Sequence, residues 1–137
     1  MARPLKIGLD YFSKDTDTFS DRKIRRLIKT QGLPGYVIFE YILCLIYSGK
    51  GYYIKYDGEL AFDVADGLGT GVEETQVIGV IATCVEVGLF DKPLYQKSKI
   101  LTSNGIQKRY LAAKKNGIID EKMIVNSVET PVNDEIT

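Results

Sequence analysis

The chain has 137 residues, with 18 lysines and arginines, 18 aspartates and glutamates, and no histidine. This length fits one domain built around a single hydrophobic core. The absence of histidine excludes a Ser-His-Asp or Cys-His nucleophile and any histidine-ligated metal site. Two cysteines without histidine cannot complete a structural zinc site either. The composition, 45% apolar and 26% charged, is ordinary for a soluble globular protein.

The net charge of zero hides an uneven distribution along the chain. Residues 1–115 carry 17 basic and 13 acidic side chains, a net charge of +4, whereas residues 116–137 carry one basic and five acidic side chains, a net charge of −4. We therefore expect a mildly basic domain over 1–115, with an N-terminal arm over 1–19, followed by an acidic linker or disordered tail over 116–137. Such asymmetry is a reason to look for a nucleic-acid partner.

Two helices are predicted after the arm. Ser20 or Asp21 offers an N-cap, and the spacing of the apolar residues that follow predicts a first helix ending near Gly32. Pro34 then suits the first turn of a second helix, because its missing N–H costs nothing there. The run over 35–48 is almost wholly apolar, so this second helix should be central and covered on more than one side.

A strand and a third helix follow. Residues 52–56 are short, aromatic and β-branched, which predicts a strand. Asp57 can cap a helix over 58–67, whose apolar residues recur on one face.

A capping box predicts the start of the fourth helix. Thr70 is followed three residues later by Glu73, and the apolar stripe beyond predicts a helix over 72–87. Residues 89–90 are expected to form a short strand, and 91–99 a loop that contains a proline.

The end of the domain completes the predicted topology. Residues 100–102 are expected to form the returning strand, and Ser103 caps a last helix that runs to about Lys115. A strand, a helical pair and a two-strand hairpin, in this order, are the topology of a winged helix. We therefore predict a mainly α (α+β) fold, a winged helix-turn-helix with about five helices and a small three-stranded sheet packed on them.

The cysteines and the N-terminus point to a reducing compartment. Cys44 and Cys84 lie 40 residues apart in apolar stretches, and we expect both to be buried and reduced. The N-terminus lacks the apolar core of a signal peptide, and no run approaches the ~20 apolar residues of a membrane span. We expect a cytoplasmic protein with no membrane partner.

Two patterns resemble cofactor or metal sites, and neither has the required spacing. Asp10, Asp15 and Asp17 lack the further oxygens and the glycine of a calcium loop, so turn and cap roles are expected for them. Three glycines at alternate positions from Gly67 to Gly71 follow a helix rather than a strand, unlike a phosphate loop. We expect no cofactor, no metal and no catalytic residues, and therefore no enzyme.

Basic side chains are the main functional signal. At 100° per residue, four of them lie beside the apolar stripe of the first helix and form a cationic ridge suited to phosphate contacts. The alternative, a solvated face with salt bridges to neighbours, stays open. The nine candidate DNA-binding residues are Arg22, Arg25, Arg26 and Lys29 in the cationic ridge, Lys92, Lys97 and Lys99 in the expected wing, and Lys108 and Arg109 on the last helix.

The fourth helix argues against sequence-specific DNA recognition. In a winged helix the helix before the hairpin normally enters the major groove. Here that helix carries Glu73, Glu74 and Glu86 and no lysine or arginine. Three carboxylates do not suit the phosphate-lined walls of the groove, so we expect DNA to be contacted through the wing and the first helix.

Several separated blocks carry a family resemblance. The blocks are residues 1–6, 8–12, 32–35, 51–54, 88–91 and 100–110. In these blocks the chain resembles the N-terminal domain of phage-type replication-initiation (replisome organiser) proteins, a winged-helix family related to the N-terminal domain of DnaD-like primosomal proteins. The resemblance covers residues 1 to about 115. It implies a role in starting phage or prophage DNA replication, by binding DNA or by assembling the initiation complex.

Two functions follow as expectations. The first is a non-enzymatic module of a phage-type replication-initiation protein that binds DNA weakly through backbone contacts. The alternative is an oligomerisation or protein-docking domain of the initiation complex, favoured by the acidic fourth helix and by three tyrosines that suit an interface core, Tyr52, Tyr53 and Tyr56. Replication proteins or a second copy of the chain would then be the partners.

Overall fold

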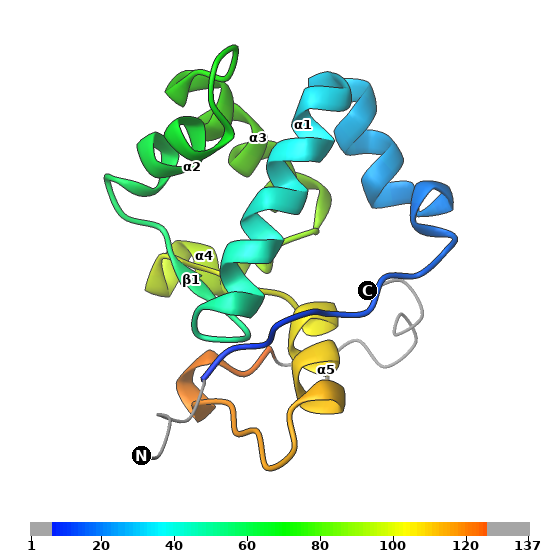
Figure 1. The fold of residues 1–137 in the computed structure, drawn as a ribbon, viewed down its shortest axis with the longest axis vertical. Coiled ribbons are helices and arrows are strands. Elements are labelled where there is room, and N and C mark those ends of the chain that lie inside the picture. Colours follow the sequence, from blue (N-terminus) through cyan, green and yellow to red (C-terminus); the bar gives the residue numbers. More distant parts are fainter. Residues whose placement is uncertain (1–6, 126–137) are drawn as a thin grey trace.

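The computed structural model describes residues 7–125 of the chain (Figure 1). The first six residues of the predicted arm and residues 126–137 of the predicted acidic tail lie outside this range. The described part is mainly helical, with five α-helices, two short 3-10 turns and a two-stranded antiparallel sheet. The mainly α prediction is confirmed, and so is the number of helices, although their boundaries differ.

The first two predicted helices form one long kinked helix, α1, over Arg22–Ser48. The predicted cap is present, because the Asp21 side chain accepts a hydrogen bond from the Lys23 N–H. The break is also where the sequence places it. Gly32 has a φ of 76°, in the left-handed region that favours glycine, and Pro34 follows two residues later.

A pair of helices covers one side of α1. Helix α2 spans Leu60–Leu68, and the Asp57 side chain accepts the backbone N–H groups of Glu59 and Leu60 ahead of it, as predicted. Helix α3 spans Glu74–Val87 and packs mainly against α1 and then against α2. The predicted capping box is wrong: Glu73 is itself the N-cap residue of α3, and no side chain caps that end.

The third predicted strand, at 89–90, is not formed. The backbone N–H groups of Leu89 and Phe90 both bond to the carbonyl of Cys84, at 2.8 and 3.2 Å, and so close the C-terminus of α3. Gly88, with a φ of 92°, makes the left-handed turn that allows this closure. Because these two N–H groups already donate to the C-terminus of α3, they cannot form the hydrogen bonds of a sheet.

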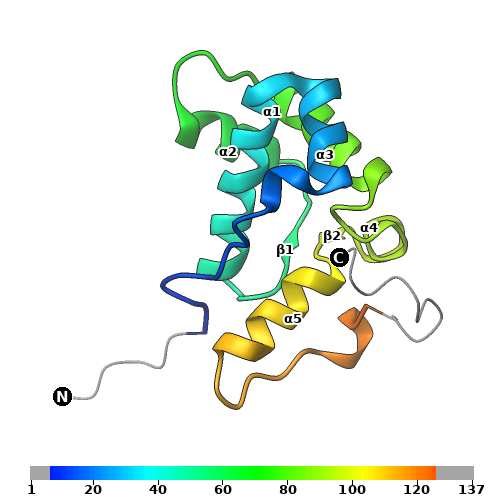
Figure 2. The same ribbon diagram turned by 90° about the vertical axis from the view of Figure 1, so that its right-hand side faces the viewer.

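The predicted wing loop is also wrong, because residues Lys92–Ser98 form helix α4 (Figure 2). Asp91 caps this helix by accepting the Leu94 N–H at 3.0 Å, and Pro93 sits in its first turn. The proline that indicated a loop thus opens a helix, a position where its missing N–H is harmless.

The sheet consists of two very short strands. Strand β1, Ile54–Lys55, pairs antiparallel with β2, Ile100–Leu101, with Ile54 opposite Leu101. Helix α5, Asn104–Ala113, follows β2, and the Ser103 side chain accepts the Ile106 N–H as predicted. The sheet therefore joins the region before α2 to the region before α5.

The core lies around the second half of α1, where α1 meets α3. Phe90 reaches this core from the α3–α4 connection, with its ring centre 5.6 Å from that of Phe39. The large side chains that are fully buried include Leu27, Ile38, Ile42, Ile46, Val77, Val80, Ile81 and Leu101. One side of α1 is nevertheless uncovered, since Leu33 and Val37 are 67% and 52% exposed. The expected cover on more than one side is present, from α3, α2 and the arm, but it does not extend all round the helix.

The cysteines differ from each other. Both are free thiols, as predicted, and Cys84 is fully buried in α3, where burial raises the pKa of its thiol. Cys44 is exposed on the uncovered side of α1, so the prediction that it is buried is wrong. An apolar run cannot show which of its faces lacks a neighbour, and this caused the error.

The N-terminal arm packs along α1, as predicted (Figures 1 and 2). The Leu9 N–H donates to the Tyr47 carbonyl at 2.7 Å, and the Phe12 ring stacks on the Tyr47 ring at 4.3 Å. A side chain at Gly8 would meet the backbone of Ser48, so glycine is required where the arm touches the helix. A short 3-10 turn, Thr18–Ser20, leads from the arm into α1.

Residues 116–125 contact α5 and Tyr52, which lies two residues before β1. The Gln107 amide, buried on α5, donates to the Met123 carbonyl at 2.7 Å and accepts the Val125 N–H at 3.0 Å. The Asp120 N–H bonds to the Tyr52 hydroxyl at 3.1 Å, ahead of a second 3-10 turn, Glu121–Met123.

Replacing Gln107 with alanine should release this segment from α5. We expect a loss of about 1–3 kcal/mol in the free energy of unfolding, because buried backbone groups lose their partners. Denaturant unfolding measures the loss, and hydrogen exchange of the Val125 amide should accelerate. Gln96→Ala, at an exposed position on α4, is the control and should change neither. Unchanged stability and exchange in Gln107→Ala would contradict the role given to this amide.

Candidate nucleic-acid interface

The cationic ridge lies on the exposed face of the first half of α1. Ile24 and Leu27 turn into the core, and all four ridge side chains, Arg22, Arg25, Arg26 and Lys29, are exposed. Within residues 7–125, none of these four side chains forms an ion pair. Of the alternative left open by the sequence, a solvated face with salt bridges to neighbours, the solvated face is present and the salt bridges are not formed within these residues.

The position of the cationic ridge on its helix is electrostatically unfavourable. The first turn of α1 contains no acidic residue and begins with Arg22 and Lys23. The N-terminus of a helix carries a partial positive charge, so cations destabilise it and anions stabilise it. Asp21 offsets part of this charge as the cap. A bound anion, such as a phosphate group, would offset the remaining positive charge at this N-terminus.

Lys23 belongs to a different environment. Its side chain lies over Gly88, the residue that caps the C-terminus of α3. A cation is favourable at the C-terminus of a helix. Lys23 thus joins α1 to α3, and Lys92, at the start of α4, follows Gly88 by only four residues.

The three lysines expected in the wing lie on and after helix α4. Lys92, Lys97 and Lys99 are exposed, so they are accessible although the wing is absent. The Lys99 Nζ lies 5.4 Å from the centre of the Tyr95 ring, a cation–π contact. Tyr95 in turn stacks on Tyr56, and burial, with Tyr95 nearby, raises the pKa of the Tyr56 hydroxyl.

The two candidates on α5 differ. Lys108 is exposed, whereas Arg109 is half-buried and pairs with Asp15 of the arm at 3.5 Å. Burial raises the pKa of Tyr47, and the neighbouring Arg109 partly offsets this rise. Arg109 therefore holds the arm against α1 and α5, and the structure does not bring it into the cationic ridge.

A strongly acidic segment follows the sheet strand β1. Residues 56–91, which include α2 and α3, carry eight acidic side chains and no lysine or arginine. Glu73, at the N-cap of α3, and Glu74 and Glu86 of α3 are exposed. In Figure 1, α2 and the first half of α1 lie on opposite sides of the molecule, whereas α3 packs against α1. The acidic side chains of α2 are therefore separated in space from the cationic ridge.

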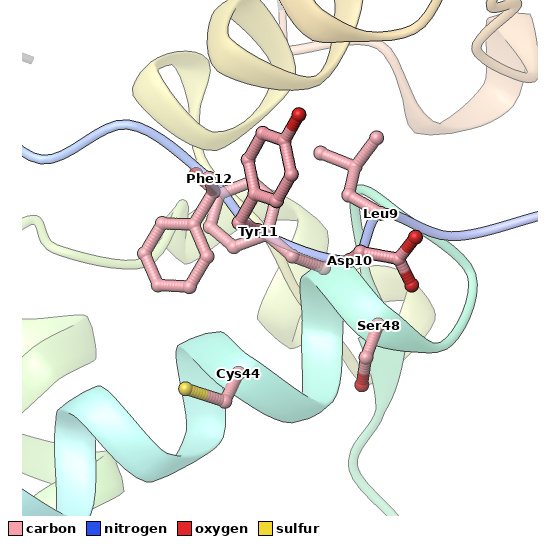
Figure 3. Close-up of a pocket in the computed structure, with 7 residues that line it drawn as sticks. Leu9, Asp10, Tyr11, Phe12, Cys44 and Ser48 are labelled. Atoms are coloured by element: carbon pink, nitrogen blue, oxygen red, sulfur yellow. The ribbon is translucent and has the colours of Figure 1, made fainter.

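A hollow lies between the arm and α1 (Figure 3). It measures about 340 Å³ and is open on one side, with Cys44 at its edge. Its lining is Leu9, Asp10, Tyr11, Phe12, Cys44, Tyr47 and Ser48. Across 7–125, no three cysteine or carboxylate side chains are grouped so as to hold a metal ion. Among those same residues, no helix is long and apolar enough to cross a membrane.

Comparison with known proteins establishes the family of the chain. A family model described as Lin1244/Lin1753-like, N-terminal, matches residues 11–106. The chain belongs to this family. The matched region contains the cationic ridge and the α4 lysines, and it stops before Lys108 and Arg109.

A curated relative links the Lin1244/Lin1753-like family to phage. An uncharacterized phage-related protein of Listeria innocua serovar 6a, Lin1244/Lin1753, is 33% identical over 133 residues, which cover 94% of this chain and 43% of the relative. The chain therefore spans less than half of that protein. No solved structure matches the chain significantly. The phage connection expected from the sequence is supported, and the names of the family and the relative do not mention replication.

One feature of the site was missed by sequence reasoning. The sequence suggests Tyr56, with Tyr52 and Tyr53, as part of an interface core, and it does not connect Tyr56 with Tyr95. The pairing of Tyr56 with Tyr95 comes from the strand register, which places Tyr56 opposite Lys99. No local pattern carries this signal, because the two tyrosines lie 39 positions apart in the chain.

Proposed function

We propose that this domain is a non-enzymatic DNA-binding module of a phage or prophage replication-initiation protein, acting in the cytoplasm. Its contacts would be made mainly to the DNA backbone, by the cationic ridge and by the lysines of α4 and α5. The observation that carries the proposal is the cationic ridge itself: four exposed cations without an ion-pair partner in the described part of the chain. Exposed cations of this kind supply the sequence-independent part of DNA affinity.

The remaining parts of the proposal follow from charge and topology. The acidic α3 does not suit the major groove, so the proposal excludes specific reading by that helix. We infer a winged-helix-related arrangement, in which α2 and α3 form the helical pair and α4 replaces the wing. The phage connection of the family supports the phage setting, and replication initiation rests on the resemblance alone.

Salt dependence of duplex binding tests the proposal. The affinity of the full chain for an arbitrary duplex should fall steeply with salt, because each phosphate contact contributes about 0.9 to the slope of log K against log salt. Arg25→Gln, Arg26→Gln and Lys29→Gln combined should reduce that slope by up to about 2.7, three contacts' worth. Fluorescence anisotropy with labelled duplex measures both quantities.

A matched triple variant provides the control. Lys50, Lys115 and Lys122 are exposed and lie outside the nine candidates, so changing them to glutamine removes the same charge. This control should keep most of the slope. No duplex binding by the unmodified chain at low salt would overturn the proposal, as would equal effects of the two triple variants.

A protein-docking or oligomerisation function is the second candidate. The observation in its favour is Phe62 of α2, which is 56% exposed within the acidic segment, where an apolar side chain rimmed by charge fits a protein interface. Sedimentation equilibrium tests the self-associating form: a strict monomer at high concentration, with or without Phe62→Ser, would exclude it.

A further inference from the structure

A pair of tyrosines lies where the sheet meets α4. Tyr56 directly follows β1, and its N–H donates to the carbonyl of Lys99 at 2.8 Å. The Lys99 N–H donates in turn to the carbonyl of Tyr95, at 3.1 Å, and ends α4. These two backbone bonds fix Tyr56, Tyr95 and Lys99 next to each other, although Tyr56 comes from a distant part of the chain.

The side chains of these three residues form a layered arrangement. The rings of Tyr56 and Tyr95, the tyrosine pair, stack with centres 5.5 Å apart and an angle of 27° between their planes. The Lys99 ammonium lies 5.4 Å from the Tyr95 ring centre. Both rings rest against the edge of the core and are only half-buried, so part of each is in contact with solvent.

Three lysines lie close to the tyrosine pair in the chain, and the ammonium of one of them, Lys99, lies over a ring. Lys55, Lys97 and Lys99 are exposed, and none of the three forms an ion pair within residues 7–125. The acidic residues nearest in sequence, Asp57 and Asp91, accept backbone N–H bonds as caps of α2 and α4. Their carboxylates are therefore partly satisfied by helix N-termini rather than by these lysines.

The backbone at Lys99 gives a further indication. Lys99 has a φ of 53°, in the left-handed region where glycine or asparagine is less strained. A lysine at such a position places its ammonium over the Tyr95 ring. The backbone conformation at position 99 does not favour lysine. A residue that disagrees with its local backbone preference is expected where its side chain serves binding.

We propose that the tyrosine pair, with Lys55, Lys97 and Lys99, is a stacking site for unpaired nucleotides of a single-stranded nucleic acid. Aromatic rings stack on any base, and neighbouring lysines bind the phosphates between bases. The inference rests on the proposed function, since it assigns the same domain a second nucleic-acid surface, and it adds the class of ligand. Duplex DNA offers no free base faces, so the cationic ridge and the tyrosine pair would contact different forms of the strand.

Substitution of the tyrosines tests the site. Binding of the full chain to labelled oligo-dT, oligo-rU and a duplex of equal length is measured by fluorescence anisotropy. Tyr56→Leu combined with Tyr95→Leu should weaken oligo-dT binding by about tenfold or more, because base stacking is lost, and should leave duplex binding unchanged. Tyr56→Phe combined with Tyr95→Phe keeps the rings and should retain oligo-dT affinity. Tyr11→Leu, at a tyrosine 85% exposed on the arm, is the matched control.

The outcomes separate this inference from the proposed function. If the duplex binds but oligo-dT affinity is the same with and without the two rings, the inference alone is overturned. If oligo-dT binds through the tyrosines and the duplex does not bind, only the proposed duplex-binding function is overturned. If neither ligand binds, both the proposed function and this inference are overturned. Equal binding of oligo-rU supports the inference with RNA as well as DNA.

A second variant covers the case in which the leucine variant does not fold. Lys97→Gln combined with Lys99→Gln changes only exposed side chains. For oligo-dT binding it should reduce the slope of log K against log salt by about 1.4, because each of two phosphate contacts to a single strand contributes about 0.7. An unchanged slope in this folded variant would overturn the inference.

Discussion

Replacing Phe90 with alanine should lower the free energy of unfolding by about 3–5 kcal/mol, the usual cost of removing a large ring from a packed core. Phe90 is fully buried, and it contacts Phe39 of α1 from the short connection between α3 and α4. Its loss would leave a cavity that the neighbouring backbone cannot fill, because that backbone is held by the cap bonds to Cys84. Denaturant unfolding followed by circular dichroism measures the change.

Phe62→Ala is the matched control for this experiment. Phe62 is the same residue type but is 56% exposed on α2, so its removal should cost much less. The Cys84 thiol, buried beside the same connection, gives a second measurement, since thiol labelling should accelerate in Phe90→Ala. A loss below about 1 kcal/mol for Phe90→Ala would show that this ring does not anchor the core.

Gly51→Ala should be nearly as damaging, with an expected loss of about 2–5 kcal/mol. Two costs combine at this position. Gly51 has a φ of 98°, which alanine adopts only with strain, and a Cβ there would lie 2.4 Å from a ring carbon of Tyr110. Tyr110 is buried against Tyr52 and has little room to move. Thermal unfolding measures the loss.

Two other glycines separate these costs. Gly69 has a φ of 95° with open space around it, so Gly69→Ala should show the backbone strain alone, about 1–2 kcal/mol. Gly58 has open space and no positive φ, so Gly58→Ala should be close to neutral. Equal losses in Gly51→Ala and Gly69→Ala would mean that Tyr110 moves aside without cost.

Local chemistry made much of the fold predictable. Asp21, Asp57 and Ser103 cap the helices for which the sequence proposes them, because a short polar side chain ahead of an apolar period is a direct signal. Gly32 and Pro34 mark the kink in α1 for the same reason. These features depend on residues within one turn of each other, and the sequence contains that information.

The errors arose where neighbours in space decide the structure. The N–H groups of 89–90 could have joined a strand or closed a helix, and the packing of Phe90 favours closure. Residues 91–99 contain a proline that fits both a loop and a helix start. Cys44 is exposed at the edge of the hollow beside the arm, and an apolar run cannot reveal which of its residues face solvent.

The candidate site was predicted to a similar extent. The exposure of the cationic ridge followed from helical spacing, since a charged face beside a buried stripe must meet solvent. The engagement of Arg109 by Asp15 could not be foreseen, because the two residues lie 94 positions apart. The tyrosine pair was missed for the same reason. Whether these surfaces bind DNA stays a prediction.

The separation of charge between α2 and the first half of α1 has a consequence for how the molecule approaches a polyanion. A body without net charge feels no overall force in a uniform field, but opposite charges at its two sides produce a torque. Near DNA, within roughly one Debye length of about 8–10 Å, this torque would turn the cationic ridge inward and the acidic segment outward before contact. The association rate should therefore fall with ionic strength even though the sequence sums to zero.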